Sequence, residues 1–341
     1  MSYVIAGILG LALLMVVHES GHLLVARAFG MRVIRFSIGF GPPLWRYQAK
    51  GSETVYQVAL IPFLAYVQIA GMNPFEENDP NDKGSYANAS LLARISAIIA
   101  GPLANYLFAS VLFFIVFAFA GKSMPTTTIK LADGPGPARI AQMKDGDTIV
   151  SVNGAQVKTW DEMRKQIAEN PNKPLDVAID RSGKPVMLKV TPELKAGEGR
   201  IGVQTVEKLV PLGVKDAAAE SLKLPAKVVS TLVVSLARIM TLQIKPELTG
   251  PVGIVRETSR AAEQGWPHYV YLLGLLSAYL GGFNALPFPA LDGGRLAFLG
   301  YEAVTRRRPN AKVEAQVHLL GLVMLLALIA VVSVFDIKGP N

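Results

Sequence analysis

Three stretches of the sequence are apolar for long enough to cross the hydrocarbon core of a lipid bilayer, and they constrain the fold more than any other feature. They cover residues 3–29, 91–120 and 313–335, and a helix needs about 20 apolar residues to cross that core. Of the 341 residues, 51% are hydrophobic and only 18% are charged, which is unlike an ordinary soluble domain. The sequence therefore predicts a membrane α-helical protein.

A fourth stretch, residues 268–300, is long enough to span a bilayer but is interrupted by Gly and Pro. With it we expect four transmembrane helices, at residues 1–30, 91–121, 268–300 and 313–335. The first lies where a signal peptide would lie, yet no basic residue precedes it and no small-residue cleavage site closes it. We therefore expect it to be retained as a span.

The net charge of +8 is interpreted as a sign of membrane topology. A nucleic-acid binder carries a clustered basic face with interleaved aromatic residues, whereas here the basic residues gather in short loops beside the apolar stretches. These residues are Arg27, Arg32, Arg35, Arg46 and Lys50 at and after the end of the first stretch, and Arg306, Arg307, Arg308 and Lys312 before the last. Because short loops rich in Lys and Arg stay in the cytoplasm, we expect both loops inside and the segment between the second and third spans outside.

Residues 31–90 have a pattern typical of strands, and residues 207–265 have a pattern typical of helices. Residues 31–90 form a cytoplasmic-side loop with strand-like runs at 33–38 and 54–60, separated by Gly and Pro, which predicts a membrane-associated β-hairpin. Residues 207–265 are predicted to be a helical linker, in which 213–243 is amphipathic and is expected to lie on a surface.

Residues 125–206 are predicted to fold as a small soluble α+β domain rich in strands. Apolar side chains alternate with polar ones over 175–179 and 186–190, and alternation at period two is typical of strands with one buried face. The segment Thr159–Glu169 begins with a capping Thr followed by Glu162, a helix-start signature. We expect this helix to pack on the sheet.

His18-Glu19-Ser20-Gly21-His22 is an H-E-x-x-H sequence inside the first apolar stretch. Four residues make about one helical turn, so both imidazoles leave the same face of the helix and can bind one metal ion. Glu19 lies beside that face and is a candidate general base for a metal-bound water. The alternative is a set of satisfied polar residues in a bundle, but such groups are costly at membrane depth unless they hold a metal.

A catalytic zinc takes three protein ligands and keeps one open position. Asp292 is the best candidate for the third ligand, because it lies in a stretch broken by Pro and Gly, and irregular backbone at membrane depth lines a cavity or is buried in protein. The alternative reading of Asp292 is a helix cap. His318 is a weaker candidate, and His268 is interpreted as an interfacial residue.

Several motifs in this order together resemble the site-2 protease family of intramembrane zinc metalloproteases, and more narrowly its bacterial branch with an extracytoplasmic PDZ domain. The resemblance covers nearly the whole chain. It rests on HESGH at 18–22, FSIGFGP at 36–42, AGPLAN at 100–105, GPVGI at 250–254 and NALPFPALDGG at 284–294, while KDGDTI at 144–149 with VNG at 152–154 resembles a PDZ signature.

The resemblance implies Zn2+ held by His18, His22 and Asp292, with Glu19 as the base and Asn284 close to bound substrate. It implies a substrate that is the transmembrane segment of a single-span protein, such as an anti-sigma factor or a remnant signal peptide. That segment would be added as a strand to the predicted membrane-associated β-hairpin within residues 31–90, which resembles the family's membrane-reentrant β element. The implied location is the bacterial cytoplasmic membrane, with the PDZ domain outside and acting as a size filter.

Two other functions remain open from the residues alone. H-E-x-x-H specifies activation of water rather than a peptide substrate, so a zinc hydrolase acting on another membrane substrate fits it. A catalytically silent membrane adaptor that binds peptides through its PDZ domain is the alternative from another class. Glu19 argues against the adaptor, which has no use for a general base.

Overall fold

A computed structural model describes residues 2–73, 79–195, 197–244 and 249–338 of the chain. It divides into two compact units. The helical unit comprises Met1–Val116 and Gly213–Asn341, and the β-rich unit comprises Phe117–Leu212. The sequence-based boundaries of the inserted domain, 125–206, fall inside the β-rich unit.

Three helices of the described chain are long and apolar enough to cross a membrane, over Tyr3–Ala28, Leu91–Ala120 and Ala311–Asp336. They correspond to α1 (Ser2–Ala28), α2 (Leu91–Ile115) with the short π-helix that follows it (Val116–Ala120), and α9 (Ala311–Lys338). This confirms that the three uninterrupted apolar stretches are helical.

The interrupted stretch is divided into two helices, α7 (Trp266–Asn284) and α8 (Asp292–Thr305). The residues between them, 285–291, form turns rather than helix. Pro287 and Pro289 lie in this break, and proline removes a helical hydrogen bond and clashes with the preceding turn. That four helices span the membrane stays a prediction.

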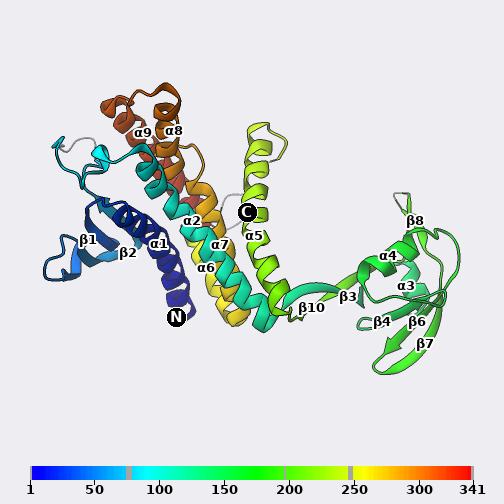
Figure 1. Cartoon of the computed structure of the whole chain (residues 1–341). Helices are drawn as coiled ribbons and strands as arrows, with labels where there is room; N and C mark the ends of the chain where they lie inside the picture. Colours follow the sequence, from blue (N-terminus) through cyan, green and yellow to red (C-terminus); the bar gives the residue numbers. More distant parts are fainter. Residues whose placement is uncertain (1, 74–78, 196, 245–248, 339–341) are drawn as a thin grey trace. The chain divides into compact units, whose positions relative to one another are not determined.

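The helices of this unit pack closely through small residues. α1 contacts α2 and α6 (Pro251–Glu263), and α2 contacts α7 (Figure 1). A side chain at Gly21 would strike the Ala100 carbonyl oxygen of α2, and one at Gly281 would strike the Pro102 carbonyl oxygen. Small residues allow such backbone approach in membrane helices, where tight packing replaces the hydrophobic effect.

The predicted hairpin is present but its strands are longer than expected. β1 (Val33–Tyr47) pairs antiparallel with β2 (Val55–Ile69), and its register shifts repeatedly. Gly39 and Gly41 have φ of +93° and +95°, so they absorb bends within β1 where we had expected the strand to end. The expected limits of 33–38 and 54–60 were therefore wrong.

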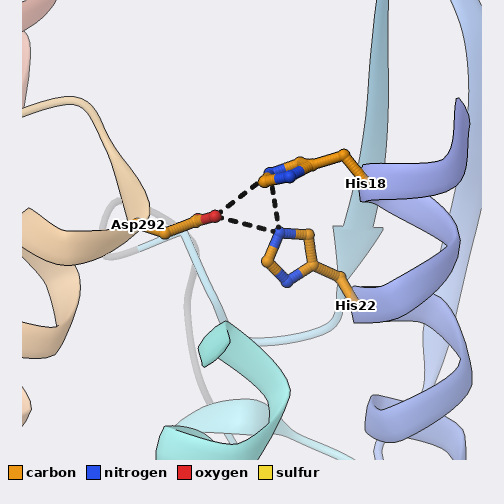
Figure 2. Close-up of side chains that lie close together, drawn as sticks. All are labelled: His18, His22 and Asp292. Carbon is orange, nitrogen blue, oxygen red and sulfur yellow. Dashed lines mark hydrogen bonds and ion pairs between the residues drawn. The ribbon is translucent and has the colours of Figure 1, made fainter. Parts of the chain in front are cut away.

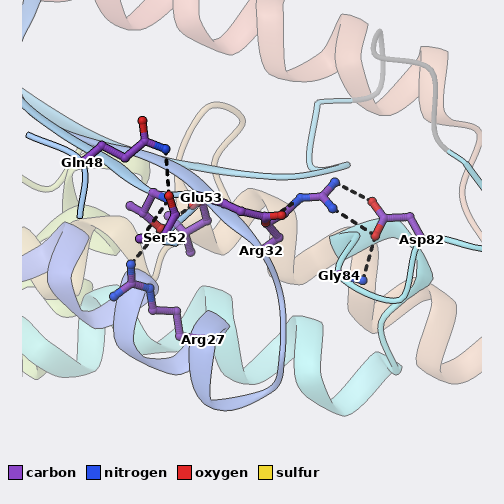
Figure 3. Close-up of polar contacts among 9 residues, drawn as sticks. Arg27, Arg32, Gln48, Ser52, Glu53, Asp82 and Gly84 are labelled. Carbon is purple, nitrogen blue, oxygen red and sulfur yellow. Dashed lines mark hydrogen bonds and ion pairs between the residues drawn. The ribbon is translucent and has the colours of Figure 1, made fainter. Parts of the chain in front are cut away.

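Polar contacts join the base of the hairpin to the end of α1 and to the loop before α2 (Figure 3). Arg32 Nη2 donates to Asp82 Oδ2 at 2.7 Å, and Asp82 Oδ1 accepts from the Gly84 backbone at 2.9 Å. Arg27 Nη2 donates to Thr54 Oγ1 at 2.7 Å. A short 3-10 helix (Tyr86–Asn88) then leads into α2. These contacts fix the hairpin beside α1.

The predicted linker at 207–265 is not a single element. α5 (Val214–Met240) is amphipathic as expected, but its buried residues pack against α2 and α7 instead of leaving the helix on an open surface. Tyr106 of α2 donates its hydroxyl to the Leu222 carbonyl at 2.8 Å. α6 follows as a separate helix. Asp336 near the end of α9 accepts from the backbone of Gly250 and Gly253, and so fastens α9 to the start of α6.

The β-rich unit is a sheet covered by a helix. Its elements are β3 (Lys122–Leu131), α3 (Pro137–Ile140), β4 (Thr148–Val152), β5 (Ala155–Gln156), α4 (Trp160–Ala168), β6 (Leu175–Arg181), β7 (Lys184–Val190), β8 (Glu193–Lys195), β9 (Glu198–Arg200) and β10 (Val203–Val210). The main sheet has the order β10-β3-β4-β6-β7, with β5 paired to β4, and β8 pairs with β9.

The local predictions in this unit are confirmed at α4 and at the β6–β7 hairpin. Thr159 caps α4 in a complete capping box with Glu162. Met163 and Ile167 of α4 pack with Ile149 and Val177 of the sheet in one core. β3 and β10 pair beyond the expected limits of 125 and 206, which is why the unit is larger than predicted. The PDZ assignment stays a prediction.

Met143, just before the KDGDTI segment, is buried in this core at 3% exposure. A cavity of about 510 Å3 lies elsewhere in the unit, lined by α4 and by residues from 132–139 and 193–203.

Candidate metal centre

His18 and His22 lie one turn apart on α1, and both are buried, at 4% and 6% exposure. Their Nε2 atoms are 3.3 Å apart. Asp292, the first residue of α8, places its Oδ2 at 3.1 Å from His18 Nε2 and at 3.2 Å from His22 Nε2 (Figure 2). The structure thus brings together the two histidines and the distant carboxylate that the sequence predicted as ligands.

The three atoms are arranged as zinc ligands would be. Their separations of 3.1, 3.2 and 3.3 Å match the edge of about 3.3 Å expected for a tetrahedron with bonds of about 2.0–2.1 Å. Oδ2 of Asp292 is buried and has no hydrogen-bond partner among the described residues. No other group of three His, Asp or Glu side chains in the described part of the chain converges in this way. The residues therefore fit a metal ion.

A second set of contacts orients the two imidazoles. Nδ1 of His22 donates to the Ala97 carbonyl of α2 at 2.7 Å, which leaves Nε2 free to bind a metal. Nδ1 of His18 lies 3.2 Å from Nδ2 of Asn105, a fully buried residue whose Oδ1 has no partner among the described residues. Turning this amide over would place Oδ1 as an acceptor for Nδ1–H, which is what a metal on Nε2 requires.

Asn105 is a residue whose role the sequence analysis missed. It ends the AGPLAN segment, which carried part of the family resemblance but was given no function. Its signal in the sequence is a polar amide inside an apolar span, and such residues are rare unless they have a partner. Only the packing of α2 on α1 identifies that partner as His18.

Gly101 explains how α2 comes so close to the imidazoles. A Cβ at this position would strike Nε2 of His22 and lie 2.9 Å from Cε1 of His18. The glycine therefore leaves the space that the two rings occupy. Any larger residue would displace a candidate ligand.

Glu19 is not part of the ligand group but faces the hairpin. Its Oε2 accepts the backbone N–H of Val67 in β2 at 3.0 Å. The carboxylate is thus held between the metal-binding helix and a strand. Glu19 is therefore separate from the candidate ligands, and its role as a base stays a prediction.

Asp292 is positioned by a tight approach of the break at 285–291 to the start of α8. A Cβ at Gly293 would strike the Leu286 carbonyl oxygen, and one at Gly294 would strike that of Phe288. The backbone N–H of Ala290 donates to Nδ1 of His318 at 3.0 Å. His318 therefore supports the break and does not join His18 and His22.

The remaining predicted residues lie apart from this group. Asn284, at the end of α7, donates its amide to the Leu280 carbonyl at 3.0 Å, and no contact with the ligand group is found among the described residues. Its role in substrate binding stays a prediction. His268 is exposed in the first turn of α7.

Comparisons with known proteins agree with this chemistry. The sequence profile described as "Peptidase family M50" matches residues 6–328. The chain is 30% identical to the zinc metalloprotease RasP of Geobacillus kaustophilus, with 94% of each chain covered. It is 32% identical to a putative zinc metalloprotease of Nostoc, covering 95% of this chain and 93% of the relative. It is 29% identical to the regulator of sigma-W protease RasP of Bacillus subtilis, with 98% of each covered.

Proposed function

The chain belongs to peptidase family M50 and is a zinc metalloendopeptidase of the site-2 protease type, and from this premise we propose that it cleaves the transmembrane segments of single-span membrane proteins. The observation that carries the proposal is the meeting of His18, His22 and Asp292 inside a bundle of apolar helices. A hydrolytic centre at that depth is of use only for a substrate that lies in the membrane.

In the proposed reaction, His18, His22 and Asp292 would hold the zinc ion, and Glu19 is the general base and acid. A zinc ion held by these residues would supply Lewis-acid chemistry for the hydrolysis. Glu19 takes the proton from the attacking water and passes it to the leaving amine nitrogen. Ala97 and Asn105 keep the imidazoles in the tautomer that presents Nε2.

The hairpin is proposed to present the substrate as an extended strand. β1 and β2 form a two-stranded sheet, so within the described chain β2 pairs on one side only. A peptide bond in a helix is shielded by its own hydrogen bonds, whereas a strand added beside β2 is exposed to attack. The hydrogen bond from the Val67 backbone N–H of β2 to Glu19 supports this proposal, because it joins β2 to the proposed base.

We further propose that the protein lies in the bacterial cytoplasmic membrane, with the Arg-rich loop at 306–312 inside and the β-rich unit outside. The β-rich unit would then exclude substrates that still carry a bulky external domain. A relative is named as a regulator of sigma-W protease, which supports anti-sigma factors as one substrate class. Remnant signal peptides are another.

The proposal is tested by co-expressing the chain with a panel of single-span proteins, each with and without its external domain. We expect cleavage of the trimmed forms by wild type and none by Glu19→Gln, with equal zinc content in both enzymes. Cleavage within the external part of the substrates, or equal cleavage by both enzymes, would contradict the proposal. A zinc-free wild type that binds peptides would favour the adaptor.

A further inference from the structure

A second polar cavity lies in the helical unit, away from the metal centre. It has a volume of about 310 Å3 and lies where the first turns of α2 and α9 meet α8 and the loop after it. Three arginines, two glutamates and a histidine line it: Arg94, Arg295, Arg308, Glu302, Glu314 and His318. Neither the proposed zinc ligands nor Glu19 line it, so the proposed reaction does not account for it.

One of the two glutamates is already paired. Arg94 binds both oxygens of Glu302, with Nη2 to Oε1 at 2.5 Å and Nη1 to Oε2 at 3.0 Å. Arg308 lies 3.7 Å from the same carboxylate and donates to the Ala87 carbonyl at 2.7 Å. The single negative charge of Glu302 is therefore shared between two guanidinium groups.

Three residues that line the cavity carry donors without a hydrogen-bond partner among the described residues. The half-buried side chain of Arg295 makes no hydrogen bond or ion pair there, although its charge interacts with that of Glu314. Nε of Arg94 and Nε2 of His318 are buried without partners. Because Nδ1 of His318 accepts the Ala290 N–H, the proton of the neutral ring lies on Nε2. Buried donors are normally paired, and among the described residues the one lining carboxylate left over, Glu314, makes no hydrogen bond or ion pair with these three donors. The cluster therefore has donors left for a further acceptor.

The formal charges and the depth of the cavity narrow the choice of ligand. Three arginines against two glutamates leave one positive charge, which favours an anion with several acceptor oxygens, such as a phosphate. Arg94 and His318 are only three and seven residues from the starts of α2 and α9, or about 5 and 10 Å at about 1.5 Å per residue. If both helices span the bilayer, this is headgroup depth, where basic pockets between helices bind anionic lipids.

We propose that this cavity binds the phosphate group of an anionic phospholipid. The Arg295 guanidinium, Nε2–H of His318 and Nε–H of Arg94 donate to the phosphate oxygens. The unpaired carboxylate of Glu314 can accept from a headgroup hydroxyl, which favours a glycerol headgroup over choline. Because α8 carries Asp292 at its start and His318 supports the break before it, a bound lipid would brace the segment that holds a zinc ligand.

Native mass spectrometry of the full chain in detergent tests the proposal with phosphatidylglycerol and phosphatidylcholine of equal acyl chains. We expect wild type to prefer phosphatidylglycerol and Arg295→Gln to lose about 10-fold in affinity for it, as a charged partner is removed. Arg307→Gln is the matched control, because Arg307 is exposed in the same loop region and does not line the cavity. It should change the affinity less than about twofold.

Two further variants keep the test decisive if Arg295→Gln disturbs the fold, which zinc content would reveal. Arg295→Lys keeps the charge but loses the planar fork, and we expect a partial loss. His318→Asn keeps an acceptor for Ala290 while removing the Nε2 donor, and we expect a loss of about 3-fold. Equal losses in the Arg295 and Arg307 variants, or no loss in any variant, would overturn the proposal.

Two further experiments distinguish a lipid phosphate from a soluble phosphate and from the chain's own carboxylates. Inorganic phosphate at millimolar concentration should not displace phosphatidylglycerol, and full displacement would identify a soluble phosphate and overturn the lipid assignment. Glu76 and Glu77 follow Met72 closely in the sequence, so Glu76→Gln/Glu77→Gln is included. Clearly tighter lipid binding by this double variant would indicate that the chain's own carboxylates fill the cavity, which would also overturn the proposal.

Discussion

Two carboxylates, one in each unit, have opposite surroundings. Asp147 in the β-rich unit is 2% exposed, and both its oxygens are paired: Arg181 donates to Oδ1 and Oδ2, and the backbone of Lys144 donates to Oδ2, each at 2.8 Å. Asp292 in the helical unit has a buried Oδ2 without a hydrogen-bond partner in the described chain, near two imidazoles. A carboxylate whose hydrogen bonds are all satisfied stabilises a fold. A carboxylate with an unsatisfied oxygen beside other ligand atoms indicates a binding site for a metal ion.

The largest effect on zinc binding and cleavage is expected when the carboxylate with the unsatisfied oxygen, Asp292, is removed. Asp292→Ala should reduce zinc affinity by more than about 100-fold and abolish cleavage, because only two protein ligands remain of the three that a catalytic zinc needs. Zinc content of the purified protein checks this, with Glu19→Gln as the control that keeps all three ligands. Full zinc occupancy in Asp292→Ala would show that another residue is the third ligand.

Asn105 tests the same contrast between satisfied and unsatisfied groups, because its Oδ1 also has no hydrogen-bond partner among the described residues. Asn105→Leu fills the same space without an acceptor and should weaken zinc binding by about 10- to 100-fold, as loss of a partner of a metal-bound histidine does. Asn105→Asp keeps an acceptor for His18 Nδ1–H and should bind zinc at least as tightly as wild type. Competition with a chelator measures both affinities. Wild-type affinity in the Leu variant would reduce Asn105 to a packing role.

Asp147, whose hydrogen bonds are satisfied, should affect the stability of the β-rich unit instead of metal binding. Asp147→Ala removes the partner of Arg181 and should lower the free energy of unfolding of the β-rich unit by about 2 kcal/mol. The cost is moderate because the Arg181 side chain is 28% exposed and keeps access to water. Pulsed proteolysis in urea on the full chain measures it. A loss of zinc in this variant, with the β-rich unit still folded, would break the contrast between the two carboxylates.

The smallest expected effect is the dependence of the stability of the β-rich unit on pH. Hydrogen bonds from Arg181 hold the pKa of Asp147 below its ordinary value of 3.8, so the folded state favours the charged carboxylate. This contribution to stability is complete well above pH 3.8 and is lost as the pH falls through the lower pKa of the folded state. Proteolysis by pepsin in urea over this range should show a steeper loss in wild type than in Asp147→Asn. Parallel curves would contradict the assignment.

Several features were predictable because their signals are local. The apolar length of α1, α2 and α9 depends on residues adjacent in sequence, and so does the capping box at Thr159 and Glu162. His18 and His22 share a face because a helix turns once in about 3.6 residues. For Asp292 the sequence supplied a candidate, by placing a carboxylate in a break at membrane depth.

Other features depend on contacts between distant segments, which only the tertiary structure decides. The helix packing brings Asp292 to within 3.2 Å of residues about 270 positions earlier, and it selects Asn105 as the partner of His18. The length of β1 through Gly39 depends on pairing with β2, which compensates for a bend that would otherwise end a strand. The unpaired donors at Arg295 and His318 appear only when α2, α8 and α9 enclose one cavity. Hydropathy and turn signals report on neighbours in sequence, whereas ligand geometry and unsatisfied hydrogen bonds are properties of the packed chain.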